Sequence, residues 1–328
     1  MKPFDFQRAE SLSHAAQLCA ADTASPIAGG TNLVDLLKLE VTAPDTLVDV
    51  NRLPMSDIAG LDGGGLRIGA LATNTAVAVD ERVRSDWPVL SRAILAGATQ
   101  QLRNRATTGG NLCQRTRCYY FTDTSQPCNK RDPGSGCGAI PGIARLHAVL
   151  GSSNQCIATY PGDMAVALAA LGATVEIAKG DHELRTVPVR EFHRLPGDTP
   201  WKDNVLEAGE IITAITLPPP VPGKQLYRKV RERSSYAFAL VSVAAIVDMA
   251  EGRIARAELA FGGLAHKPWY DPRLSELLMG KTPDEALFEQ AADLLLEEAK
   301  GFGENDFKIP LARRTLKAVL GDATGVAL

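Results

Sequence analysis

Apolar and polar residues recur with two different periods along this chain, and each period predicts a different kind of element. Apolar residues three or four positions apart predict helices, at residues 13–21, 33–37, 88–96, 163–171 and 311–320. In the first of these helices Cys19 is predicted to be a buried thiol that packs as a small apolar side chain. The sequence TPDE at 282–285 is typical of a capping box. It predicts a further helix from there to about residue 300.

Runs that alternate, or that are apolar throughout, predict strands, at residues 26–27, 47–50, 66–70, 174–177, 184–187 and 211–217. Near the N-terminus, a strand, a glycine turn, a helix and a returning strand predict a βαβ unit within residues 26–50. The proline-rich residues 218–222 cannot continue a strand, so they mark a domain boundary. Beyond them, strand-like runs predict an antiparallel sheet, at residues 224–233, 237–249 and 253–261.

Length and composition narrow the class of protein. A chain of 328 residues is longer than one hydrophobic core usually serves, so two or three domains are expected. A hydrophobic content of 45% and a charged content of 22% are ordinary for a soluble globular protein. The net charge of -3 gives no global reason to expect nucleic acid as a partner. No apolar run predicts membrane insertion, and the first residues lack the apolar core of a secretory signal peptide.

The segment 104–137 contains the chemistry that stands out most. It is rich in Gly, Pro, Asn and Asp, and is predicted to form neither a helix nor a strand of its own. At residues 107–111 it reads TTGGN, a glycine turn whose composition lets backbone approach an anion closely. An earlier turn, GGTN at 29–32, precedes a predicted helix whose first N–H groups would favour an anion. Alone, that turn is equally typical of an ordinary tight turn, and it is not the three-glycine dinucleotide fingerprint.

Positive charge is concentrated in the same segment. Against the single acid Asp123 stand six cationic side chains: Arg103, Arg105, Arg115, Arg117, Lys130 and Arg131. One interpretation is a solvated basic surface. The other is a positive potential beside a phosphate or an anionic cluster.

Cysteines gather just after the second glycine turn. Six cysteines in a chain of this length do not make a disulfide scaffold. Four of them fall within 39 residues: Cys118, Cys128, Cys137 and Cys156. A metal or cluster site would hold such a long irregular loop together, so the pattern favours one.

The two glycine turns, each followed by Asn, and the predicted C-terminal sheet and helices resemble one known family. It is that of the FAD-binding subunits of molybdenum hydroxylases, the xanthine dehydrogenase and carbon monoxide dehydrogenase flavoproteins. The matching pieces are 27–33, 107–111, Asp163, 227–229 and 239–244. The resemblance implies an α+β, FAD-binding PCMH-type fold of two subdomains and a C-terminal domain. The domains are expected at 1–55 (βαβ), 56–217 (a larger mixed sheet with a cysteine-rich insertion at about 113–156) and 223–328 (antiparallel sheet plus helices).

The same resemblance implies which residues bind FAD. The first turn would meet the pyrophosphate through Ile27, Ala28, Gly29, Gly30, Thr31, Asn32 and Leu33. The second turn would touch FAD through Thr107, Gly110 and Asn111. Asp163 would face the adenosine side, while Ile212 and Lys229 would give the flavin an apolar wall and a polar contact. From the residues alone, Asp163 is also explained as a helix cap, Lys229 as a surface lysine and Ile212 as a core residue.

A narrower resemblance concerns the cysteines. Residues 114–118, 126–131 and 133–137 resemble the FAD subunit of periplasmic aldehyde oxidoreductases, which carries an extra [4Fe–4S] cluster in this insertion. It implies Cys118, Cys128, Cys137 and Cys156 as the four thiolate ligands, with Cys113 as a spare thiol. The wide, irregular spacings favour iron–sulfur over zinc, which prefers short paired spacings; zinc or a disulfide pair remains the alternative.

The implied function is electron transfer within a heterotrimer. An aldehyde would be oxidised at a molybdenum cofactor in a large partner subunit. Electrons would pass through two [2Fe–2S] clusters of a small partner subunit to FAD on this chain, and then to an external acceptor. No catalytic side chain is predicted here, since the five histidines are scattered. The alternatives are a stand-alone FAD oxidase and a zinc-stabilised assembly module without catalysis. The expected location is the periplasm by co-export with a signal-bearing partner, or otherwise the cytoplasm.

Overall fold

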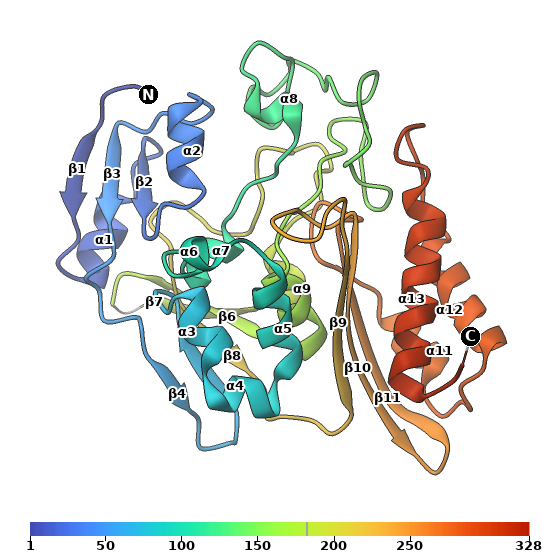
Figure 1. The fold of residues 1–328 in the computed structure, drawn as a ribbon. Helices are drawn as coiled ribbons and strands as arrows, with labels where there is room; N and C mark the ends of the chain where they lie inside the picture. Colours follow the sequence, from blue (N-terminus) through green and yellow to red (C-terminus); the bar gives the residue numbers. More distant parts are fainter. Residues whose placement is uncertain (182, 328) are drawn as a thin grey trace.

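Three sheets follow one another along the chain. The computed structural model describes residues 1–181 and 183–327, so His182 and Leu328 lie outside the described residues. Figure 1 shows the N-terminal sheet on the left, a middle sheet behind a group of helices, and the C-terminal sheet on the right, backed by the last three helices. The order of the sheets in space therefore follows their order in the sequence.

The N-terminal sheet is parallel, in the order β1-β3-β2. Its elements are β1 (Asp5–Arg8), α1 (Leu12–Leu18), β2 (Ala24–Ile27), α2 (Leu33–Lys38) and β3 (Thr46–Asp49). The predicted βαβ unit is therefore confirmed, as β2, α2 and β3. Cys19 belongs to the small core beside this sheet, and burial raises the pKa of its thiol to about 11. It is a buried thiol, as predicted.

The middle sheet has the order β4-β5-β8-β6-β7. Its strands are β4 (Ile58–Gly60), β5 (Leu66–Gly69), β6 (Thr174–Lys179), β7 (Glu183–Pro188) and β8 (Ile211–Leu217). All the pairings described in it are antiparallel, so the expectation of a mixed sheet is wrong. The reason lies partly in the connections: β4 and β5, like β6 and β7, are too close in sequence for the crossover that parallel neighbours need.

A group of helices shares one hydrophobic core with the middle sheet and with the inner face of the next sheet. They are α3 (Asn74–Val79), α4 (Glu81–Asp86), α5 (Pro88–Ala96), α9 (Met164–Leu171) and α10 (Val189–Phe192). All eight residues of α9 are buried, because this helix contacts α5 on one side and β10 and β11 on another. A helix that is apolar all round is stable only in such a position.

Between α5 and α9 lies the segment that carries the glycines and cysteines. It contains α6 (Gln100–Arg103), α7 (Thr108–Leu112) and α8 (Tyr119–Thr122), and then turns and bends up to α9. The expectation that 104–137 forms no helix is therefore wrong. Thr107 caps α7 by accepting the N–H of Gly110, and α8 buries Phe121, so local capping and packing offset the unfavourable composition.

The C-terminal sheet is antiparallel, as predicted, in the order β12-β11-β10-β9. Its strands are β9 (Lys224–Val230), β10 (Val241–Ala250), β11 (Arg253–Gly262) and β12 (Trp269–Tyr270). On β10, Val243 and Ala245 face one core while Ala244 and Ile246 face the other. Both faces are covered, and this explains why the strand is apolar without alternation.

The outer face of that sheet is covered by α11 (Pro272–Leu278), α12 (Glu285–Leu296) and α13 (Lys308–Thr324). The capping box predicted at 282–285 is wrong, because the N-cap of α12 is Asp284, two residues after the predicted Thr282. The carboxylate of Asp284 accepts the N–H of Leu287 at 2.7 Å and caps α12; Asp is a stronger cap than Thr. Within the described residues, no helix combines the length and the apolarity needed to cross a bilayer.

The C-terminal core predicts the cost of a cavity. Phe288 on α12 is fully buried, so Phe288→Ala should lower the free energy of unfolding by about 3–5 kcal/mol. Leu184→Ala is the control, because Leu184 is 71% exposed on β7, and it should change stability by less than about 0.5 kcal/mol. Denaturant unfolding of both variants measures the difference. Equal stabilities would contradict the packing described.

Candidate functional site

A large cleft lies between the three parts of the molecule. Its volume is about 1120 Å³, above the roughly 300–1,000 Å³ of ordinary small-molecule pockets. Its walls come from the N-terminal unit, from the segment between α5 and α9, and from β9 with the loop that follows it. The cleft therefore has room for a ligand of dinucleotide size, and residues of the N-terminal and C-terminal sheets, together with the segment between α5 and α9, line it.

The structure brings nearly all the predicted FAD residues together in this cleft. Its lining includes Ile27, Ala28, Gly29, Gly30, Thr31, Asn32, Leu33, Thr107, Gly110, Asn111, Asp163 and Lys229. Ile212 is the exception. It lies on β8 in the core of the middle sheet, and so its contact with a flavin stays a prediction without support from the lining.

The first glycine turn is pressed against the start of the second one. A Cβ on Gly29 would come within 1.9 Å of the carbonyl oxygen of Arg105, and Gly30 has a φ of +73°. Neither position accepts a side chain without strain. The first helical bond of this region runs from the Val34 N–H to the Gly30 carbonyl. The N–H groups just before it have no acceptor within the helix and suit an anion in the cleft.

The second glycine sequence differs from the turn that was predicted. Thr108, Gly109 and Gly110 belong to α7, and their N–H groups are bound by Ala72, Ala70 and Thr107. The expected approach of an anion to these N–H groups is therefore not available. What faces the cleft is the side chains of Thr107 and Asn111 and the exposed Gly110. A contact with the cofactor here would be a side-chain or van der Waals contact.

Asp163 and Lys229 form a buried ion pair at the cleft wall. Asp163 Oδ2 lies 2.8 Å from Lys229 Nζ, and the Tyr227 hydroxyl donates to Asp163 Oδ1 at 2.6 Å. The two charged side chains are only 8% and 4% exposed. Asp163 precedes α9 but makes no side-chain cap bond, so it is not the helix cap that the sequence allowed. Lys229 is likewise not a surface lysine.

The basic residues of the segment are mostly buried or face the cleft. Arg103, Arg115 and Arg117 line it, and burial lowers the pKa of Arg117. Arg115 Nη2 and Arg117 Nε are buried and have no hydrogen-bond partner within the described residues. A solvated basic surface is therefore wrong for these side chains. Donors left without partners in a cleft are what an anionic ligand would satisfy.

Two further lining residues were not identified from the sequence. Asn74 Oδ1 and Ser242 Oγ are buried in the cleft wall without a hydrogen-bond partner among the described residues. Ser242 had a signal, since it is a polar residue inside the apolar run of β10. Asn74 had none that separates it from an ordinary residue of a helix start.

A second, small cavity adjoins the first. Its lining contains the thiols of Cys118, Cys128, Cys137 and Cys156, and all of them are free. In the described part of the chain, no three His, Cys, Asp or Glu side chains are grouped to hold a single metal ion. A cluster needs a wider arrangement, because its iron and sulfide atoms lie between the thiolates. Four thiols around one cavity fit the donor set of a [4Fe–4S] cluster.

The two cavities share walls. Thr116 and Cys118 line both of them, and Nε2 of His147, a residue of the cleft, lies 3.0 Å from Cys118 Sγ. Burial lowers the pKa of His147 to about 4. Cys113 lines only the cleft, where burial raises the pKa of its thiol to about 12. It is therefore separate from the four cysteines of the cavity.

Comparisons with known proteins agree with this arrangement. Residues 2–220 match the FAD-binding domain in molybdopterin dehydrogenase, and residues 225–323 match the CO dehydrogenase flavoprotein C-terminal domain. The chain is 51% identical over 330 residues, 100% of both sequences, to the aldehyde oxidoreductase FAD-binding subunit PaoB of Escherichia coli (strain K12). The glyceraldehyde dehydrogenase medium chain of Sulfolobus acidocaldarius is 28% identical, over 88% of this chain and 85% of its own.

The fold is shared with solved structures as well. The crystal structure of quinoline 2-oxidoreductase from Pseudomonas putida 86 matches with a TM-score of 0.74 and 26% identity, covering 99% of each chain. Together with the two family matches, this confirms the predicted fold class of a two-part FAD-binding region followed by an antiparallel-sheet domain.

The close contact between Gly29 and the backbone of Arg105 predicts that adding a methyl group at Gly29 will weaken FAD binding. Gly29→Ala should sharply lower the FAD content of the purified protein, because its Cβ would push the first turn away from residue 105. Flavin absorbance per chain measures the content. Gly60→Ala is the matched control, since a Cβ there meets no atom within 4 Å. Equal flavin content in the two variants would contradict the role given to this contact.

The buried ion pair predicts non-additive stabilities. Lys229→Met should cost about 3–5 kcal/mol of unfolding free energy, because it leaves the carboxylate of Asp163 buried without a cation. The double variant Asp163→Asn, Lys229→Met removes both charges and should be more stable than Lys229→Met alone. Denaturant unfolding of the two single variants and the double variant tests this. Strictly additive costs would show that the pair is not coupled.

Proposed function

Since the chain belongs to the family of FAD-binding subunits of molybdenum hydroxylases, we propose that it is the electron-transfer subunit of a heterotrimeric enzyme that oxidises aldehydes. In this proposal a large partner subunit holds the molybdenum cofactor, and a small one holds two [2Fe–2S] clusters. Electrons come from those clusters to FAD on this chain and leave to an external acceptor. The full-length 51% identity to an aldehyde oxidoreductase FAD-binding subunit supports the aldehyde as substrate class.

The observation that carries the proposal is the cleft, in which two glycine sequences from distant parts of the chain meet. FAD, when bound, supplies the capacity to accept and release electrons; the protein sets its position and environment. The first turn offers N–H groups for the diphosphate. Arg115 and Arg117 offer buried donors that no described residue uses. Asp163 and Lys229 keep a charged pair at the wall without placing a net charge there.

We also propose a [4Fe–4S] cluster with Cys118, Cys128, Cys137 and Cys156 as ligands. The shared cavity of these four thiols supports it. Such a cluster, when bound, stores one electron. Lys130 supplies positive charge beside the cavity, which favours the more negative, reduced form.

For location, we propose the periplasm, reached by co-export with a partner that carries the export signal. The support is the resemblance of residues 114–137 to the subunits of periplasmic aldehyde oxidoreductases. Fractionation of cells that express all three subunits, with and without the partner's signal, tests it. A protein that stays cytoplasmic in both cases would overturn this part of the proposal.

Metal and flavin analysis of the purified complex tests the cofactors. We expect one FAD and, beyond the [2Fe–2S] pairs, about four further irons per chain. Cys128→Ser should remove or convert that extra iron, whereas Cys113→Ser and Cys19→Ser should leave it unchanged, since neither residue lines the cysteine cavity. Retention of all iron in Cys128→Ser would contradict the ligand assignment. Copurification with two further subunits, one containing molybdenum, separates an electron-transfer subunit from a stand-alone oxidase.

A further inference from the structure

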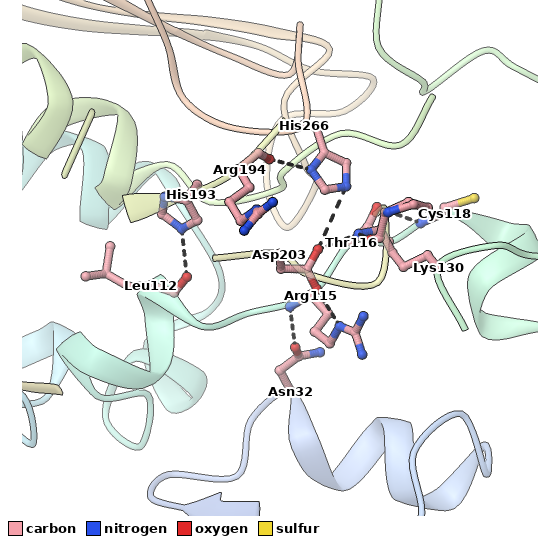
Figure 2. Close-up of polar contacts among 11 residues, drawn as sticks. Asn32, Leu112, Arg115, Thr116, Cys118, Lys130, His193, Arg194, Asp203 and His266 are labelled. Atoms are coloured by element: carbon pink, nitrogen blue, oxygen red, sulfur yellow. Dashed lines mark hydrogen bonds and ion pairs between the residues drawn. The ribbon is translucent and has the colours of Figure 1, made fainter. Parts of the chain in front are cut away.

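A buried ion triad links the two cavities. Asp203 accepts hydrogen bonds from Arg115 Nε at 2.7 Å through Oδ2 and from Lys130 Nζ through Oδ1. Figure 2 shows the three side chains converging from different segments, with His266 on the far side of the carboxylate. Arg115 lines the cleft and not the cysteine cavity, while Lys130 lines the cysteine cavity and not the cleft. Asp203 therefore connects Arg115, a cation of the cleft, with Lys130, a cation of the cysteine cavity.

Lys130 is held rigidly at its end of the triad. Its side chain is 1% exposed, and Nζ also donates to the Pro200 carbonyl at 2.6 Å. The residue follows Cys128 by two positions, so its stem forms part of the cavity wall. A buried ammonium needs such partners, because an unpaired one is strongly disfavoured. Without Asp203, Lys130 would keep only one carbonyl acceptor.

Arg115 is fixed at the other end with part of its guanidinium unused. Its backbone N–H donates to Asn32 Oδ1 of the first glycine turn at 2.8 Å. Its guanidinium lies over the Phe121 ring, with its carbon 4.8 Å from the ring centroid. Nη2 has no hydrogen-bond partner within the described residues. The same residue thus contacts the turn, the triad and the cleft.

The triad carries a net positive charge. Burial acts to raise the pKa of the Asp203 carboxyl, but Lys130, Arg115 and His266 together lower it to about 2. His266 Nε2 lies 3.8 Å from Asp203 Oδ1, and burial lowers the pKa of His266 to about 4, so the imidazole is neutral at pH 7. One carboxylate therefore stands between two permanent cations.

We propose that Asp203 is a positioning residue whose ion triad with Arg115 and Lys130 couples the charge of the cysteine cavity to that of the flavin cleft. The inference rests on the proposed function, with FAD in the cleft and a [4Fe–4S] cluster in the cavity. In each group the reduced form is the more negative one, so the net positive triad favours reduction of both. Because Asp203 is shared, removing either cation leaves more of the carboxylate charge acting on the opposite site.

If the two sites are coupled, removing each cation should change the reduction potential of the group whose site that cation does not line. Lys130→Met should lower the reduction potential of the cluster and also that of FAD. Arg115→Met should lower the potential of FAD and also that of the cluster. Asp203→Asn keeps one acceptor oxygen and removes the negative charge, so both potentials should rise. At a fixed potential we expect the ratio of reduced to oxidised cluster to change on the order of tenfold, which is about 59 mV for one electron.

Two matched controls and one charge-conserving variant separate coupling from general charge effects. Arg131→Met removes a cation next to Lys130 whose guanidinium binds the carbonyls of Tyr120, Phe121 and Gln126 instead of Asp203. It should move the cluster potential and leave that of FAD in place. Asp198→Asn removes an exposed acid five residues before Asp203 and should move neither. Asp203→Glu keeps the charge and should restore both potentials in large part.

The experiment is an anaerobic redox titration of the purified heterotrimer, following the cluster by electron paramagnetic resonance and FAD by absorbance. Wild-type protein with flavin but no additional cluster would overturn the proposed cluster and this coupling together. Wild-type protein with both groups, and a Lys130→Met variant whose FAD potential is unchanged, would overturn the coupling alone. If Asp203→Asn does not fold, the two cation variants still decide the question.

Discussion

The structure depends on the contact between Gly29 and the backbone of Arg105. A carbonyl oxygen occupies the position where any other residue would place its Cβ, so the N-terminal βαβ unit can sit against the start of α7 only with glycine there. Through this contact, two segments that are about eighty residues apart in sequence form one continuous wall of the cleft. The cleft, its basic side chains and the wall that it shares with the cysteine cavity all depend on that arrangement.

The charges of the site are organised by burial. Lys229 and Lys130 are both nearly inaccessible: Asp163 pairs with Lys229, whereas Asp203 pairs with Lys130 and also with Arg115. Arg115 and Arg117 differ, because each keeps a buried nitrogen without a partner among the described residues. Paired cations hold the walls of the site in place, whereas donors without partners are left for the ligand. The distinction separates structural from ligand-directed charge within a single basic segment.

Sequence reasoning was most successful where a local pattern decides the structure. The βαβ unit, the antiparallel C-terminal sheet and the burial of Cys19 follow from periodicity and turn residues, and the structure has them. It was wrong where a competing local interaction decides. Thr107 turns a predicted glycine turn into a helix by capping it, and Asp284 replaces the expected capping box. The ion pair of Asp163 could not be predicted, because its partner Lys229 is 66 residues away in the sequence.

Nothing in the sequence pointed to Asp203, because it lies in a loop that is 88 and 73 residues away along the chain from Arg115 and Lys130. Only the fold brings the three charges together. The hydrogen bonds of the cysteine-rich segment were also not foreseen, since the sequence suggested that a metal would hold this loop together. The protein itself supplies bonds there: Asn129 Oδ1 accepts the N–H groups of Gly134 and Gly136, and Arg131 binds three carbonyls.

Further along, the C-terminal domain holds the same segment from outside. Asn305 and Lys308, both fully buried, donate to the carbonyl of His147, the residue whose imidazole contacts the thiol of Cys118. The loop is therefore held both by its own side chains and by a neighbouring domain. Its four thiols line one cavity that adjoins the cleft, and the proposed electron-storing cluster rests on this arrangement. The fold, more than the spacing of the cysteines along the sequence, brings the four thiols together.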